Sequence, residues 1–189
     1  MNQVLLVDEQ DKALRYEEKV IAHELCLLHR AFSIFIFRIE SQKLELLVQQ
    51  RAYTKYHSGG LWSNTCCGHP LEDKSIEESA NDRLYEEMGI RAHLKYLGWF
   101  CYQVPVAAHM YEHENDHVFV GILSSYKCKI RSNLEEVIDF KWIEWSQVLE
   151  TLTAVTPWFK PAVQHLLTTI NQTDLLNLIQ TMQIQKSNL

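Results

Sequence analysis

A thiol and an imidazole stand two positions apart in the segment Trp62–Pro70, which reads WSNTCCGHP. We expect a short extended segment here, which a glycine and a proline bring to an end directly before a helix. Alternate side chains of an extended segment share a face, so Cys67 and His69 should point the same way and Cys66 the opposite way. That arrangement is typical of a functional site, but a buried strand end, in which Cys is simply a small hydrophobic residue, explains the stretch equally well.

Nine histidines are a high number for this chain and prompt a search for metal ligands. Two of them, His23 and His29, precede His69 and complete a cluster of three imidazoles. Taken singly, each histidine is more often a surface residue or a satisfied core residue than a ligand.

A run of acidic residues occupies 111–116, where Asp116 follows Glu112 and Glu114. If this piece is extended, the two glutamates present their carboxylates on one face and Asp116 joins them. A solvated acidic turn before a strand is the alternative, and from these residues alone it is favoured. Four cations spread along the chain could hold a phosphate group, although scattered lysines and arginines normally indicate only a soluble surface. They are Lys19, Arg51, Lys55 and Arg83.

Strands and one central helix must position these groups. Ser75 and Glu78 form a capping box that starts the helix, and Gly89 ends it, so that Arg83 and Glu87 lie beside the edge of its apolar stripe. Residues 51–60 have the composition of a surface loop. The hydrophobic pattern predicts strands at residues 4–7, 30–39, 44–50, 93–104, 116–123 and 137–143.

Helices follow the strands in the last third of the chain. We expect a short helix at 145–151 and a C-terminal helical region from about residue 162 to residue 185, broken near Asn171. The order of strands, one helix, more strands and then helices predicts a single mixed α/β or α+β domain that covers residues 1–189.

Composition limits the class of protein. A chain of 189 residues, 47% hydrophobic and 22% charged, is long enough for one sizeable core and is typical of soluble globular proteins. Its net charge of −6 argues against a nucleic-acid or anionic-membrane surface. Five cysteines without framework spacing indicate reduced thiols. Because we find neither a signal peptide nor an apolar run near the roughly 20 residues of a membrane span, we expect a cytoplasmic protein. We also expect a monomer.

Four short segments resemble the signature segments of type I isopentenyl-diphosphate delta-isomerases, in the same order. They are Leu28–Ser33, Cys67–Pro70, Glu112–Glu114 and Thr156–Phe159, and the resemblance spans roughly residues 19–159. It implies the Nudix fold, in which a mixed sheet is held between helices. It also implies that the protein isomerises isopentenyl diphosphate to dimethylallyl diphosphate in isoprenoid biosynthesis.

The Nudix box, G-x5-E-x7-R-E-U-x-E-E-x-G-U with U aliphatic, is a useful control. Aligned on Gly68, it is matched at Leu84, Glu86, Glu87, Gly89 and Ile90. It fails at Lys74, Asp82 and Arg83, where Glu, Arg and Glu are expected. Nudix hydrolases use the glutamates of the box to bind magnesium ions for the cleavage of a diphosphate linkage. Lys74 and Arg83 instead leave positive charge that can bind a diphosphate intact, which favours an isomerase over the alternative, a Nudix hydrolase of a small or nucleoside diphosphate.

The resemblance assigns roles to individual residues. Moving the double bond requires protonation of the terminal alkene carbon, a tertiary carbocation-like state, and loss of a proton from the neighbouring methylene. Cys67 and Glu114 match the two proton-transfer groups. Tyr102 matches a tyrosine that hydrogen-bonds the catalytic carboxylate, and Trp158 would stabilise the cation through its π face.

The resemblance also implies metal ions. A divalent metal (Mg, Mn or Zn) would be held by His23, His29, His69, Glu112 and Glu114. The diphosphate of this small-molecule substrate would lie against Lys19, Arg51, Lys55 and Arg83, with a second ion, Mg, bridging it to Glu87. A non-catalytic metal domain that serves as an interaction module is the third hypothesis, but it leaves Cys67, Trp158 and the cations unexplained.

Overall fold

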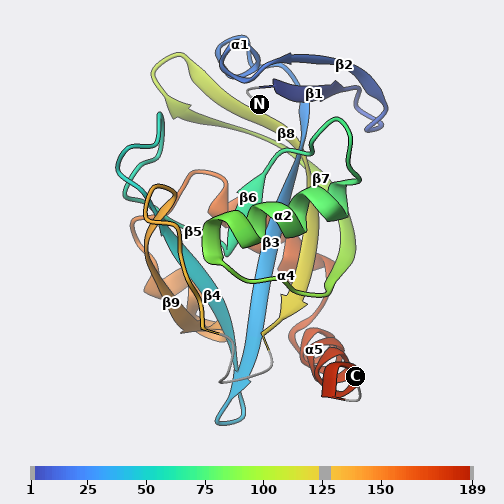
Figure 1. Ribbon diagram of the computed structural model, residues 1–189, viewed down its shortest axis with the longest axis vertical. Helices are drawn as coiled ribbons and strands as arrows, with labels where there is room; N and C mark the ends of the chain where they lie inside the picture. The colour runs from blue at the N-terminus through green and yellow to red at the C-terminus, as the bar shows by residue number, and fades with distance from the viewer. Residues whose placement is uncertain (1–2, 124–128, 188–189) are drawn as a thin grey trace.

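The computed structural model describes residues 3–123 and 129–187. Within them, the strands form one mixed sheet, and helices cover both of its faces (Figure 1). The strands are β1 (Gln3–Val7), β2 (Ala13–Glu18), β3 (His29–Glu40), β4 (Lys43–Arg51), β5 (Trp62–Ser63), β6 (Cys66–Gly68), β7 (Leu94–Ala107), β8 (Met110–Ile122) and β9 (Val137–Glu144). The helices are α1 (Lys19–Glu24), α2 (Ile76–Met88), α3 (Val148–Thr151), α4 (Phe159–Thr169) and α5 (Gln172–Ser187), and a 3-10 turn at Trp145–Gln147 precedes α3.

The central strand is β3, which is apolar on both faces. Phe32, Ile34 and Ile36 pack against α2, whereas Phe35 and Phe37 pack on the opposite face with α4 and α5. The alternation follows from the two-residue period of a strand. On one side β3 pairs antiparallel with β4 and β6, and on the other it pairs parallel with β8. Figure 1 accordingly shows α2 in front of the sheet and α4 behind it.

The helix α2 begins and ends as the sequence predicts. The Glu78 N–H donates to Ser75 Oγ at 3.2 Å, and the Ser75 N–H donates to the Glu78 carboxylate at 2.9 Å. Gly89 ends the helix with a φ of 67°, a left-handed conformation that glycine adopts without strain. Leu84 and Met88 are fully buried against the sheet.

Several predicted features differ from the structure. The strand β8 starts at Met110 rather than near residue 116, so the acidic residues lie in a strand and not in a turn. These acidic residues are extended because β7 and β8 form a long hairpin, in which Tyr102 pairs with Glu114. Residues 51–60 are not wholly a surface loop, since Ala52 and His57 are buried. The C-terminal helical region begins at Phe159 and divides into α4 and α5 at the predicted break.

The hairpin of β3 and β4 turns at Ser41 and Gln42. Both residues have a positive φ, of 49° and 67°, as a two-residue type I′ turn requires. The turn lies at the end of the sheet opposite the N-terminal strands (Figure 1). Among the described residues, no helix combines the length and apolar character needed to cross a bilayer.

Candidate active site and metal centre

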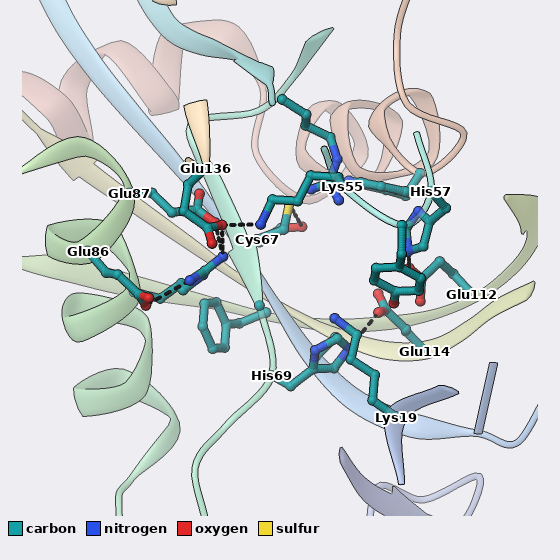
Figure 2. Close-up of a pocket in the computed structure, with 18 of the residues that line it drawn as sticks. Lys19, Lys55, His57, Cys67, His69, Glu86, Glu87, Glu112, Glu114 and Glu136 are labelled. Carbon is teal, nitrogen blue, oxygen red and sulfur yellow. Dashed lines mark hydrogen bonds and ion pairs between the residues drawn. The ribbon is translucent and has the colours of Figure 1, made fainter. Parts of the chain in front are cut away.

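The protein has a cavity of about 450 Å³ at the end of β3 where the strand becomes polar. On the face that carries Phe37 and Phe35, the next alternate residues are Ser33, Ala31 and His29, so the apolar core gives way to the cavity there. Of the predicted site residues, all but His23 and His29 line this cavity. These lining residues are Lys19, Arg51, Lys55, Cys67, His69, Arg83, Glu87, Tyr102, Glu112, Glu114 and Trp158. Figure 2 shows carboxylates towards both ends of the cavity, with Cys67 between them.

The pairing of β6 with β3 decides which cysteine faces the cavity. Cys67 pairs with Ser33 and lines the cavity, whereas Cys66 pairs with Ile34 and is fully buried in the core beneath α2. The structure therefore has the two thiols on opposite faces, as alternation predicts. The next position requires a glycine, Gly68, because a Cβ there would lie 2.8 Å from the Phe32 ring.

The thiol of Cys67 lies in a buried hydrogen-bonded setting. It donates to Asn64 Oδ1 at 3.0 Å, and its sulfur lies 3.6 Å from Ser33 Oγ. The Ser33 hydroxyl donates in turn to Asp116 Oδ2 at 2.7 Å. Burial, with the nearby Asp116 adding to it, raises the pKa of Cys67 to about 12. The free protein therefore holds this group as a thiol at neutral pH.

The strand β8 presents Glu112 and Glu114 to the same region. Tyr102, the partner of Glu114 across the hairpin, donates its hydroxyl to Glu114 Oε2. The other oxygen, Oε1, lies 3.2 Å from His69 Nε2 and 3.4 Å from His29 Nε2. Burial and Glu112 both oppose ionisation of Glu114, but these two imidazoles outweigh them and lower its pKa.

Four side chains meet in a group that could hold a metal ion. One ligand atom each from His23, His29, His69 and Glu112 lies within 4.8 Å of all the others. They come from α1, β3, the end of β6 and β8, and no local sequence spacing reveals the group. Burial, with the charge of Lys19 adding to it, lowers the pKa of His69 to about 4, which keeps its ring neutral as a metal ligand must be.

Orphaned atoms within this group fit a cation. His23 Nε2, His29 Nε2 and Glu112 Oε2 are buried and face one another or Glu114, with His23 Nε2 3.0 Å from Glu112 Oε2, but among the described residues none of the three atoms makes a hydrogen bond of good geometry. The opposite nitrogen of His29, Nδ1, lies 2.8 Å from the Leu27 carbonyl oxygen and so carries the proton. That tautomer leaves the Nε2 lone pair facing the carboxylates. Glu114, the fifth predicted ligand, is not one of the four residues of this group, although its Oε1 lies beside the imidazoles of His69 and His29.

The other end of the cavity is a cluster of paired charges around Arg83. Its guanidinium contacts Glu86 at 2.7 Å, Glu87 at 2.6 Å, and Glu136. Lys55 also pairs with Glu136. Burial opposes ionisation of Glu136, but these two cations outweigh it and lower its pKa. Two of the predicted phosphate ligands are therefore held in place by carboxylates in the free protein.

The two remaining predicted cations lie near aromatic rings. The Arg51 guanidinium lies 5.1 Å from the centre of the Trp158 ring, and its buried Nε has no partner among the described residues. The Lys19 ammonium lies 5.3 Å from the centre of the Tyr56 ring. Lys74, in contrast, does not line the cavity, because it pairs with Asp82 on the outer side of α2. Of the two cations that replace Nudix-box glutamates, only Arg83 reaches the cavity.

Sequence reasoning missed three residues of the site. His57 Nε2 lies 3.2 Å from Glu112 Oε1, the Tyr56 hydroxyl lies 2.8 Å from His23 Nδ1, and Glu136 bridges Lys55 and Arg83. His57 and Tyr56 were not predicted as site residues because the composition of residues 51–60 indicates a surface loop. The count of nine histidines was a signal for His57, but nothing local distinguished Glu136 from its neighbour Glu135.

Comparisons with known proteins agree with this architecture. Residues 27–166 match the model of the NUDIX domain. A solved structure from Deinococcus radiodurans, DR0079, superposes with a TM-score of 0.64 at 14% identity and covers 86% of this chain and 98% of its own. The MutT protein from Methanosarcina mazei Go1 superposes with a TM-score of 0.58 at 17% identity, over 73% of this chain and 91% of its own. Fold and domain match together make this chain a Nudix-domain protein, with the mixed sheet between helices that defines the class.

Sequence relatives narrow the assignment. A protein of Serratia proteamaculans, called isopentenyl-diphosphate Delta-isomerase, is 42% identical over 160 residues, which are 82% of this chain and 86% of that protein. A protein of the same name from Photobacterium profundum is 42% identical over 173 residues, 87% of this chain and 94% of that protein. The chain belongs to the isopentenyl-diphosphate Delta-isomerase family.

Proposed function

We propose that the protein converts isopentenyl diphosphate to dimethylallyl diphosphate by adding one proton and removing another. The observation that carries the proposal is the convergence of Cys67 and Glu114 on one cavity from strands on the two sides of β3. A Nudix hydrolase needs an activated water and no such pair of proton carriers. The family assignment supports the same choice.

The reaction needs a proton at the terminal alkene carbon and the loss of one from the neighbouring methylene. One of Cys67 and Glu114 gives the first proton, and the other takes the second from the opposite side of the substrate. Tyr102 holds the Glu114 carboxylate through its hydroxyl, while Asn64 holds the Cys67 thiol. Both reacting groups are thus oriented before the substrate enters.

The tertiary carbocation-like state must be kept from water. Trp158 forms part of the cavity wall and is 4% exposed, so its ring can face the cation in a dry setting. The Trp158 ring already has the Arg51 guanidinium on one face. Binding of the diphosphate by Arg51 neutralises that charge and leaves the electron density of the ring to the substrate cation.

We propose that His23, His29, His69, Glu112 and Glu114 hold a divalent metal, with Mg, Mn and Zn all compatible with these ligands. When bound, the metal supplies positive charge beside Glu114 and so tunes its proton affinity. A second ion, Mg, would be held through Glu87. Each oxygen of Glu87 has one partner, Arg83 or Gln49, and keeps a lone pair that could face the ion.

The diphosphate would replace carboxylates around the cations. Arg83 and Lys55 are both paired with Glu136, so their guanidinium and ammonium groups are already directed at one point. A diphosphate offers more negative charge to the same donors. The free thiols of the described part of the chain, Cys26, Cys66, Cys67 and Cys101, support our expectation that this enzyme acts in the reducing cytoplasm. We also propose that it acts as a monomer on a small molecule.

One NMR time course tests the reaction. The protein, isopentenyl diphosphate and a divalent metal are incubated in deuterated water. We expect dimethylallyl diphosphate with solvent deuterium in its new methyl group, because protonation there is a chemical step, and no release of phosphate. Phosphate release without deuterium incorporation would show a hydrolase and would overturn the proposal. If the protein catalysed neither reaction, the interaction-module hypothesis would be supported.

A further inference from the structure

The loop of residues 52–61 has a fixed shape and can therefore position side chains. Its base is closed by hydrogen bonds from the Arg51 N–H to the Leu61 carbonyl and from the Gly60 N–H to the Arg51 carbonyl, each 3.0 Å long. The Ala52 N–H donates to the Glu136 carbonyl at 2.9 Å. Gly60 has a φ of 77°, which allows the chain to return to β5.

Tyr56, in this loop, touches both a metal-ligand candidate and a substrate cation. Its hydroxyl lies 2.8 Å from His23 Nδ1, and the two rings are parallel within 6°. With Nδ1 engaged, His23 presents Nε2 to Glu112 Oε2 at 3.0 Å. The ammonium of Lys19 lies over the Tyr56 ring, 5.3 Å from its centre.

His57 makes the corresponding pair of contacts one residue later. Its Nε2 lies 3.2 Å from Glu112 Oε1, the oxygen that does not face His23. Its Nδ1 lies 3.2 Å from Ser58 Oγ, which can donate to it and leave the ring proton on Nε2. Its ring meets the Trp158 ring edge-on, with centroids 5.6 Å apart. Its nitrogens are not among the four ligand atoms that cluster within 4.8 Å, so it supports Glu112 rather than joining the ligands.

We infer that Tyr56 and His57 are positioning residues, which orient His23 and Glu112, respectively, for the metal. They also couple the metal centre to the substrate pocket, Tyr56 through Lys19 and His57 through Trp158. The first half concerns metal binding alone, whereas the coupling rests on the proposed function. Partners that orient metal ligands typically contribute about 10–100-fold to metal affinity. Lys55 and His57 of this one loop lie towards opposite ends of the cavity in Figure 2, beside Glu136 and Glu112.

Metal affinity tests the first half. The metal-stripped full chain is titrated with Mn²⁺, and free Mn²⁺ is measured by its paramagnetic resonance signal. Tyr56→Phe and His57→Ala should each raise the dissociation constant about 10–100-fold. His57→Gln should recover most of the loss, because its amide N–H can donate to Glu112 Oε1. Tyr53→Phe is the matched control, since Tyr53 is 74% exposed in the same loop, and it should bind Mn²⁺ like the wild type.

Two outcomes would overturn this half of the inference. One is Mn²⁺ binding by Tyr56→Phe and His57→Ala within about threefold of the wild type, well below the effect expected of ligand-orienting partners. The other is a His57→Gln variant as weak as His57→Ala, which would assign the effect to lost packing. Tyr56→Phe removes one oxygen from a half-exposed ring and keeps the packing of that ring.

The kinetic constants test the coupling. At saturating Mn²⁺, Tyr56→Phe should keep the KM for isopentenyl diphosphate of the wild type, because the ring still lies beneath Lys19. Tyr56→Leu should raise both the Mn²⁺ dissociation constant and KM. Equal KM values for these two variants would refute the coupling. A wild-type protein that binds Mn²⁺ but does not isomerise the substrate would refute the proposed function instead, and the metal titration would still decide the role of the loop.

Discussion

Replacing Arg83 by methionine should destabilise the protein and weaken substrate binding together. The guanidinium contacts Glu86, Glu87 and Glu136, and methionine removes the charge while filling similar space. The Glu87 side chain is 3% exposed, so it would lose its ion pair without gaining contact with water. The other two carboxylates are more exposed, and Glu136 would keep Lys55.

The magnitude follows from burial. Removing one partner of a buried pair costs about 3–5 kcal/mol, and because Gln49 still donates to Glu87 at 2.9 Å we expect the lower value, about 3 kcal/mol. Glu86, with a 56% exposed side chain, adds little. In a chain of this size 1 kcal/mol corresponds to about 2–4 °C, so Tm should fall by about 6–12 °C. Loss of a charge-assisted contact of about 1.5–3 kcal/mol should raise KM about 10–150-fold.

Urea unfolding followed by circular dichroism, together with initial rates, measures both effects. In the Arg83→Met/Glu87→Gln double variant the buried charge is gone with its partner, so stability should recover by about 1 kcal/mol or more relative to Arg83→Met. The reasoning would be refuted if Arg83→Met unfolded at the urea concentration of the wild type. It would also be refuted if Glu87→Gln lowered the stability of Arg83→Met further.

Three other outcomes follow from the structure. Cys67→Ala should lower turnover about 10²–10⁴-fold, whereas Cys66→Ala should cost about 1 kcal/mol of packing and leave turnover near the wild-type value; equal effects would refute the face assignment. His69→Ala should release metal under mild chelation and His165→Ala should not, as metal analysis after dialysis will show. Burial lowers the pKa of His117, so its protonation opposes folding, and unfolding free energy should fall below about pH 6.5. His117→Gln should show a smaller loss between about pH 7.5 and pH 5.5, and an unchanged loss would contradict that assignment.

Local signals in the sequence predicted the fold well. The capping box at Ser75 and the glycine at position 89 fix both ends of α2 because they act through neighbouring residues. The start of β8 could not be predicted in the same way. Residues 111–116 are too polar to indicate a strand, and they are extended because β7 lies beside them and provides hydrogen-bond partners.

The candidate site was predictable where alternation or a family motif applied. Cys67 and its opposite orientation to Cys66 follow from the strand period alone. The roles of Tyr56 and Glu136 could not be inferred, because their contacts with His23 and Arg83 join segments far apart in the chain. Lys74 shows the converse error: its place in the Nudix box suggested a cavity cation, but its side chain turns outward to Asp82.

The β3–β4 turn gives the protein a region that can be altered without touching catalysis. It lies eight residues along β3 from Ser33, which lines the cavity, and at about 3.3 Å per residue that is roughly 26 Å. Ser41 and Gln42 hold left-handed conformations that asparagine and glycine adopt more readily. An engineer could therefore strengthen this turn, or attach a fluorophore or surface tether there, and keep the chemistry at the other end of the strand unchanged.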